Sequence, residues 1–227
     1  ADMLLAPGAA YRFDGRTHAY PDIRLVHWAG GNPFHHHQQL NRLLSAWQQP
    51  ETIVVNEIWW TPTARRADIV LPATTGLERS DIGGSSRDRY ILAMHQAIRP
   101  LHRARNDFDI FGELAQRLGM QDAFTEGRDE FAWIRSIYER CVINHRALGI
   151  EFPDFDFFWK TGYVELPLPE SDFILMEYFR RDPVAHPLRT QSGRIELTSA
   201  RIAAMPDVDL PAHPAWLAPI EWLGAEI

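Results

Sequence analysis

Three groups of residues stand directly after short apolar runs, which is where a binding site forms at the edge of a parallel sheet. They are residues 30–32 (two glycines and an asparagine), residues 56–57, and the long polar segment 72–87. Adjacent glycines permit positive φ angles and a close approach of the backbone to a ligand, and Asn32 can both donate and accept hydrogen bonds. Glu57 can accept hydrogen bonds from a ribose or a base edge. These residue types suit recognition of a nucleotide.

The segment 72–87 is unusually long for a connection without regular structure, and such loops are usually functional. It contains Arg79 and the hydroxyls of Thr74 and Thr75, which are suitable donors to an anionic ligand such as a phosphate. The alternative is a solvated connection in which Arg79 pairs with Glu78 or Asp81. The residues by themselves leave both interpretations open.

Three consecutive histidines, His35, His36 and His37, suggest a metal site, but their spacing does not support one. Consecutive residues at the start of a helix point about 100° apart, whereas ligands on one helical face are usually four residues apart. We expect one imidazole to face the ligand and no metal to be bound by protein side chains. Cys141 is the single cysteine, which excludes an internal disulfide and a cysteine-rich metal site.

No motif for side-chain catalysis can be assembled. The sequence has no ordered Ser–His–Asp set, nucleophile elbow, P-loop, HExxH motif or EF-hand loop, and no pair of carboxylates stands out as acid and base. The loop at 30–33 also lacks the GxGxxG fingerprint, so an ordinary strand-to-helix turn is the alternative there. A binding face without a visible catalytic group indicates a cofactor that carries the chemistry itself.

A parallel sheet would have to position these groups. Apolar runs at 23–28, 52–55 and 68–72 have the length of buried strands, and residues 40–47 repeat apolar side chains at helical spacing. Parallel strands need such a crossover, and ligands then lie beyond the carboxyl ends of the strands. We therefore predict an α/β fold: a Rossmann-like wound parallel sheet flanked by helices, with an irregular Pro-rich C-terminal extension.

The composition divides the chain into three parts. Residues 1–21 mix glycine, proline and single aromatic residues, and predict an irregular lead-in with a short hairpin. Residues 22–150 contain the strand and helix pattern and form the predicted binding domain. Residues 151–227 are rich in proline and predict a helical and extended segment that completes or leaves that domain.

Shorter patterns add further elements. Residues 90–94 predict a strand, and helical spacing predicts helices over 106–119 and from about 129 to 148. The aromatic segment 155–159 favours a packed cluster over a ligand cage. Residues 192–197 predict a turn that leads into a strand.

Charge and hydropathy exclude two classes of partner. The formal net charge of the 227 residues is −7 and no broad basic stripe is present, which argues against a nucleic-acid partner. No apolar run approaches the roughly 20 residues that cross a bilayer. Because the sequence begins without an initiator methionine, we expect it to be an internal segment of a longer protein.

Four stretches resemble one enzyme family. They are WAGGNPFHHHQQLNRLLSAW from Trp28, VVNEIWWTPTARRADIVLPATTGLERSDIGG from Val54, RNDFDIF from Arg105, and SGRIELTS from Ser192. They resemble the molybdopterin oxidoreductases of the dimethyl sulfoxide reductase family, and within it the biotin sulfoxide and trimethylamine N-oxide reductases. The resemblance extends over nearly the whole chain in unbroken order.

The resemblance implies that this Rossmann-like region holds one of two molybdopterin guanine dinucleotides that together bind a molybdenum ion. Many relatives carry Gln-Asp where this chain has residues 56–57. The residues implied to contact the cofactor are Gly30, Asn32, His36, Asn56, Glu57, Arg79 and Asp107.

It also implies an oxygen-atom transfer from an S-oxide or N-oxide to reduced molybdenum, followed by two-electron re-reduction. The substrate would be biotin sulfoxide, methionine sulfoxide, dimethyl sulfoxide or trimethylamine N-oxide, and the partners would be the cofactor and the missing domains of the same chain. The serine that binds molybdenum lies in a portion absent from this sequence. We therefore expect this chain by itself to bind no cofactor, to contain no catalytic residue and to be inactive. The alternative is a cofactor-free binding or scaffold module with the same fold.

Overall fold

The computed structural model describes residues 1–85, 88–147, 149–168, 172–205 and 210–218. The chain divides into two compact units. The first unit consists of Ala1–Val26, Pro33–Thr52 and Ser171–Ile227, and the second of His27–Asn32 and Ile53–Glu170.

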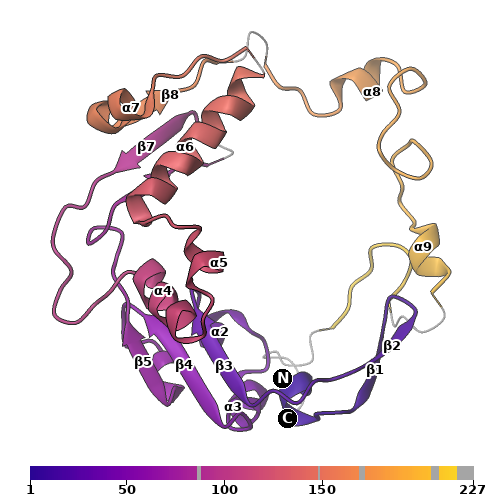
Figure 1. Cartoon of the computed structure of the whole chain (residues 1–227). Helices are drawn as coiled ribbons and strands as arrows, with labels where there is room; N and C mark the ends of the chain where they lie inside the picture. Colours follow the sequence, from indigo (N-terminus) through magenta and orange to yellow (C-terminus); the bar gives the residue numbers. More distant parts are fainter. Residues whose placement is uncertain (86–87, 148, 169–171, 206–209, 219–227) are drawn as a thin grey trace. The chain divides into compact units, whose positions relative to one another are not determined.

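A small parallel sheet has the strand order β3-β4-β5, with β3 at Leu25–Ala29, β4 at Thr52–Glu57 and β5 at Ile69–Pro72 (Figure 1). β4 is the central strand, and its Ile53 and Val55 are 3% and 1% exposed. These two side chains lie on one face of the sheet, and Val54, which points to the opposite face, is half-buried. The parallel sheet predicted from the sequence is confirmed.

The first unit begins with α1 (Asp2–Leu5) and a hairpin of β1 (Ala10–Phe13) and β2 (Arg16–Ala19). The tight turn between the two strands has Gly15 at φ +73°, a conformation that glycine adopts without steric cost. The hairpin predicted within residues 1–21 is therefore confirmed.

The described part of the first unit contains further helices: α2 (Pro33–His36), α3 (Leu40–Trp47), α8 (Glu177–Arg181) and α9 (Ala200–Ala203). α3 is the predicted crossover helix and buries Ala46 and Trp47. The ring of Trp47 packs edge-on against Phe34, with 5.5 Å between the ring centroids.

The strand predicted within residues 192–197 is wrong, because the structure has only turns and bends there. Local bonds take the backbone groups that a sheet would use. The carboxylate of Glu196 accepts from the backbone N–H of Ser192 at 2.6 Å, and the Thr190 hydroxyl donates to the Arg194 carbonyl at 2.6 Å. Such side-chain bonds compete with a strand ladder.

A second sheet, in the second unit, is antiparallel. Its order is β6-β7-β8, with β6 at Asp81–Gly83, β7 at Tyr90–Met94 and β8 at Tyr163–Glu165. β7 was predicted, but its two partners are too short to show a period in the sequence. The pairing of Ile91 with Val164 joins segments that are more than 70 residues apart.

The helices of the second unit include the two long helices that were predicted from their spacing. The unit contains the short 3-10 helix η1 (Ala64–Arg66), α4 (Asp107–Arg117), α5 (Gln121–Thr125), α6 (Glu130–Arg146) and α7 (Phe155–Thr161). Asn106, Asp129 and Asp154 cap α4, α6 and α7 by accepting hydrogen bonds from the first-turn N–H groups. Both long predicted helices are confirmed, while the expected end at Leu148 lies outside the described residues.

α6 and α7 form an apolar core with the antiparallel sheet. Tyr138 of α6 and Phe158 of α7 are completely buried and stack with ring centroids 4.2 Å apart. The Tyr138 hydroxyl donates to the Pro153 carbonyl at 2.8 Å, and burial raises the pKa of Tyr138 to about 12. The aromatic segment 155–159 is thus a packed cluster, as predicted.

Among the helices that the structure describes, none is long and apolar enough to cross a membrane.

Candidate functional site

The carboxyl ends of β4 and β5 lie side by side and bring the predicted binding groups to one edge of the parallel sheet. Asn56 pairs with Leu71 and Glu57 with Pro72 in the strand register. Beyond β5, Ala73 forms a parallel bridge with Arg105. This bridge draws the residues just before α4 to the same edge.

Asn56 is the centre of a hydrogen-bond chain at this edge. Its Oδ1 lies 2.9 Å from Nε2 of His27 in β3, and its Nδ2 donates to Oδ1 of Asp107 at 2.7 Å. The side chain of Asn56 is only 5% exposed. Three elements, β3, β4 and α4, are therefore joined through one buried amide.

Asp107 is the first residue of α4 and is exposed. The helix begins here because the Asn106 side chain accepts from the backbone N–H of Phe108 at 3.2 Å. The positive end of the helix dipole favours a carboxylate at this position. One oxygen of Asp107 accepts from Asn56, and the other has no hydrogen-bond partner among the described residues. That oxygen is available to accept from a ligand.

The loop after β3 presents a second polar group. Gly30 and Gly31 have φ angles of +78° and +69°, and no atom lies within 4 Å of a Cβ built on either glycine. Asn32 is 7% exposed and its Oδ1 accepts from the hydroxyl of Thr63. Its Nδ2 is buried and has no partner in the described part of the chain. A buried donor without an acceptor is costly, so Nδ2 of Asn32 is a candidate donor to a ligand.

Glu57 does not extend freely from the strand end. Its two carboxylate oxygens accept from the backbone N–H of Ile58 at 2.9 Å and from the hydroxyl of Thr61 at 3.0 Å. Thr61 in turn accepts from the N–H of Ala64 and so begins η1. Glu57 therefore stabilises the loop, and each carboxylate oxygen keeps one further lone pair for another donor.

The loop after β5 is fixed by Glu78. The Glu78 carboxylate is 4% exposed and accepts from the N–H groups of Thr75 at 2.8 Å and Leu101 at 2.6 Å. These backbone hydrogen bonds lower the pKa of Glu78. In the same loop the hydroxyl of Thr74 is buried without a partner among the described residues. A fixed loop that contains an unsatisfied hydroxyl is more typical of a ligand-binding loop than of a solvated connection.

Arg79 forms an ion pair with Asp81 at the start of β6, and both side chains are about one-third exposed. The pair corresponds to one of the two arrangements left open by the sequence. Glu130, at the start of α6, has one buried oxygen without a partner among the described residues. Burial is the main cause that raises the pKa of Glu130.

His36 is the predicted site residue that belongs to the first compact unit, where it is exposed at the end of α2. The other six predicted residues all belong to the second unit. Within that unit, hydrogen bonds and strand register bring Asn56, Glu57 and Asp107 together. Among the described residues, no group of three or more metal-binding side chains is present.

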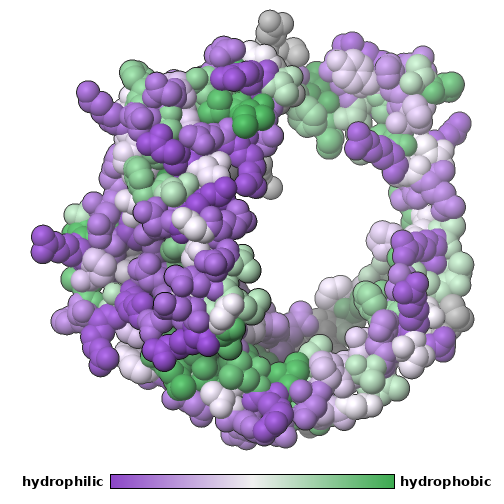
Figure 2. Space-filling view, viewed as in Figure 1, coloured by the Kyte–Doolittle hydropathy of each residue, from purple (hydrophilic) through white to green (hydrophobic). Residues whose placement is uncertain are grey.

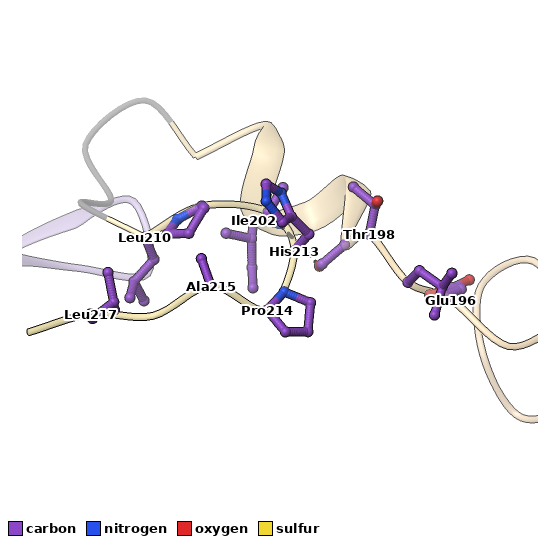
Figure 3. Close-up of a pocket in the computed structure, with 12 residues that line it drawn as sticks. Glu196, Thr198, Ile202, Leu210, His213, Pro214, Ala215 and Leu217 are labelled. Atoms are coloured by element: carbon purple, nitrogen blue, oxygen red, sulfur yellow. Dashed lines mark hydrogen bonds between the residues drawn. The ribbon is translucent and has the colours of Figure 1, made fainter.

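The surface near this edge is polar (Figure 2), and an open cavity lies elsewhere in the structure. Figure 2 shows hydrophilic residues over much of the visible face around α4, where Asp107 and Asp109 are exposed. An open cavity of about 420 Å³ lies instead in the first unit, where Ile202 of α9 and the segment 210–217 line it (Figure 3). It contains none of the predicted site residues.

Sequence reasoning missed His27, Thr63 and Glu78 as parts of the site. His27 stands inside an apolar run and was counted only as a strand residue. Glu78 was considered only as a possible partner of Arg79. A signal in the sequence was available for His27, because a polar residue inside an apolar strand must find a partner when it is buried. Thr63 and Glu78 lie in loops, and no local pattern marks them.

The sequence around this edge is similar to that of known enzymes. The family model described as molybdopterin oxidoreductase matches residues 12–117, a range that contains all seven predicted site residues. The chain is 54% identical to biotin sulfoxide reductase of Cereibacter sphaeroides, over 99% of this chain and 30% of that protein. It is 51% identical to the dimethyl sulfoxide/trimethylamine N-oxide reductase of the same organism, over 98% of this chain and 28% of that protein.

The chain belongs to the molybdopterin oxidoreductases, in the dimethyl sulfoxide reductase family. The chain spans less than a third of the length of these two curated relatives. The fold of acetylene hydratase from Pelobacter acetylenicus is also similar, with a TM-score of 0.58 and 20% identity over 89% of this chain and 25% of that one. The family resemblance predicted from the sequence is confirmed.

Proposed function

We propose that the sheet edge formed by the ends of β3, β4 and β5 binds the guanosine part of a molybdopterin guanine dinucleotide. The single observation that carries this proposal is the set of polar groups at the edge that have no partner in the described chain. Asn32 Nδ2 and the Thr74 hydroxyl are buried, while one oxygen of Asp107 is exposed. A ligand with both donor and acceptor groups would satisfy them.

The residues fit such a group by chemistry. Ionised Asp107 is an acceptor only, and guanine presents adjacent N–H donors on one edge. The open backbone at Gly30 and Gly31 would let a bulky ligand approach the chain closely. Asn32 and Thr74 would then donate to oxygen atoms of the bound molecule. Arg79, which lies in the loop after β5, adds a cation that suits an anionic group of the ligand. His36 is proposed as a cofactor contact on the family resemblance alone.

The proposed parent activity is reduction of an S-oxide or N-oxide by oxygen-atom transfer, since the relatives named above are a biotin sulfoxide reductase and a dimethyl sulfoxide/trimethylamine N-oxide reductase. When bound, the molybdenum pterin, in its bis(guanine dinucleotide) form, would supply the oxygen-transfer and two-electron chemistry. This chain's residues would bind and orient the cofactor. None of them would act as a catalytic group or a molybdenum ligand.

The same proposal extends to the organisation of the chain. Residues 22–150 would form a Rossmann-like domain that binds the cofactor, residues 1–21 would lead into it, and the Pro-rich residues 151–227 would complete or leave it. The parallel order β3-β4-β5 and the crossover helix α3 support the Rossmann-like assignment. The partners would be further domains of the same enzyme and a small oxide substrate.

The proposal is tested on the full-length enzyme that contains this chain. Oxidative denaturation should release a fluorescent pterin, and acid hydrolysis should release GMP. Asp107→Asn replaces an acceptor with a group that also donates, and removes a charged hydrogen bond of about 1.5–3 kcal/mol. We expect cofactor to be lost about 10- to 100-fold faster from that variant.

Asp109→Asn is the matched control. Asp109 is also exposed in the first turn of α4, so this change alters helix charge equally without altering the site. Its rate of cofactor loss should equal that of the native enzyme. Full-length enzyme that releases neither pterin nor GMP would reject the proposal and favour a cofactor-free scaffold.

A further inference from the structure

The hydrogen-bond chain from His27 through Asn56 to Asp107 has a direction that its chemistry fixes. An asparagine amide has one accepting end, Oδ1, and one donating end, Nδ2. Ionised Asp107 has only acceptors, so Nδ2 must face it, at 2.7 Å. Oδ1 must then face His27, at 2.9 Å. The Nε2 atom of His27 consequently carries a proton and donates it to this bond.

The burial of Asn56 limits what it can do. The side chain is 5% exposed, and both of its ends are occupied within the chain. A direct contact between Asn56 and a ligand would have to replace one of these bonds. Asp107, in contrast, is exposed and keeps one free oxygen among the described residues.

We propose that His27 and Asn56 are positioning residues that hold the carboxylate of Asp107 with one oxygen toward the ligand. The inference rests on the proposed function and deepens it, because it separates the residue that contacts the base from two residues that orient it. A carboxylate held at a defined angle accepts from two adjacent N–H groups of a guanine. It cannot accept in the same way from the N1 atom of an adenine, which has no proton.

Packing supports this role of His27. Its ring lies against Phe111 of α4, with 5.0 Å between the ring centroids. The imidazole is thus held by α4, the same helix that begins with Asp107. Rotation of the ring away from Asn56 would break the contact with Phe111 as well as the hydrogen bond. A side chain held by both packing and a hydrogen bond orients a binding group more precisely than one held by a hydrogen bond alone.

The first experiment needs no cofactor. In the 227-residue chain with ¹⁵N-labelled histidine, long-range ¹H–¹⁵N spectra identify which nitrogen of His27 is protonated. At a pH where His27 is neutral, we expect a single tautomer with the proton on Nε2. Asn56→Leu removes the acceptor and should leave a mixture of both tautomers. A proton found on Nδ1 in the native chain, or no change in Asn56→Leu, would overturn the inference.

The second experiment measures the rate at which cofactor leaves the full-length enzyme. The cofactor released into protein-free samples is assayed as fluorescent pterin after oxidation and as GMP after acid hydrolysis. His27→Leu removes the donor and should raise this rate about tenfold, the change expected for the loss of one hydrogen bond. His27→Gln keeps an N–H donor at a similar reach and should restore most of the retention. If the His27 ring only fills space, glutamine should not restore cofactor retention better than leucine does.

A double variant shows whether His27 acts through Asp107. If it does, His27→Leu in an Asp107→Asn background should raise the rate by less than about twofold beyond Asp107→Asn by itself. Independent tenfold effects that multiply would overturn the inference, because they would show that His27 acts elsewhere. Melting temperatures of all variants, measured in parallel, separate a loss of retention from a loss of fold.

The outcomes distinguish this inference from the proposed function. If the native enzyme releases no GMP, both fail. If it releases GMP, and Asp107→Asn speeds the release while His27→Leu does not, the proposed function stands and only the positioning role is rejected.

Discussion

The carboxylate of Glu78 accepts the backbone N–H of Leu101 at 2.6 Å, and this bond joins the loop after β5 to the segment that leads into α4. The second oxygen of Glu78 accepts from the N–H of Thr75. One buried side chain thus fixes both sides of the proposed site.

Glu78→Gln should lower the melting temperature of the chain. The glutamine can offer one oxygen, so its amide N–H₂ would face one of the two backbone N–H groups without an acceptor. The backbone hydrogen bonds lower the pKa of Glu78, so its stabilisation is full above the unfolded value, near pH 4.5. It is lost as the pH falls through the lower folded value. Thermal melts of both proteins should therefore converge in acid, and a constant difference down to pH 2 would contradict this account.

Glu130→Gln should raise the melting temperature of the chain at pH 7. Burial raises the pKa of Glu130, so the charged form is disfavoured in the folded state. Stability contributed by this group is present below pH 4.5 and falls as the pH rises through the folded pKa. The glutamine variant should therefore melt higher than the native chain at pH 7 and equally at pH 4. A variant that is less stable at pH 7 would show that the charge at the start of α6 matters more than its burial.

Tyr138→Phe should cost about 1 kcal/mol, because it removes the hydrogen bond to the Pro153 carbonyl inside the core. Burial raises the pKa of Tyr138 to about 12, above its unfolded value near 10. The native chain should accordingly lose stability between about pH 10 and 12, and the phenylalanine variant should lose less over that range. Urea denaturation at pH 8 and pH 11 measures both effects.

Phe158→Ala should destabilise the second unit by about 3–5 kcal/mol, since a completely buried ring leaves a cavity beside Tyr138. Phe157 precedes it on α7 and is 60% exposed, so Phe157→Ala is a control of equal chemistry. The control should change the free energy of unfolding by about 0.5 kcal/mol or less. Equal effects in denaturant titrations would mean that α7 does not pack as described.

The 227-residue chain by itself should not reduce methionine sulfoxide with a reduced viologen as electron donor. Its residues are proposed to bind and orient a cofactor, and no catalytic group is expected among them. The rate of viologen oxidation should equal that of the buffer. Turnover by the purified chain would contradict the assignment of the reactive metal to another part of the enzyme.

The sequence by itself determined the local elements near the site. Apolar runs of strand length predicted β4 and β5, and the capping residues Asn106 and Asp129 marked the starts of α4 and α6, because these signals lie within a few residues of each other. The distinctive stretches around residues 28–47 and 54–84 also carried the family resemblance. Of the proposed site, the sequence indicated the strand-end groups at Asn32, Glu57 and Arg79.

Only the tertiary structure decided which polar groups meet. β6 and β8 are three residues each and have no readable period, so their pairing with β7 depends on contacts across more than 70 residues. The hydrogen bond from Asn56 to Asp107 joins positions 51 residues apart. The hydrogen bond from His27 forms only because the Asn56 amide lies beside it in the folded chain. Hydrogen bonds between distant segments follow from packing of the elements, and no local pattern encodes that packing.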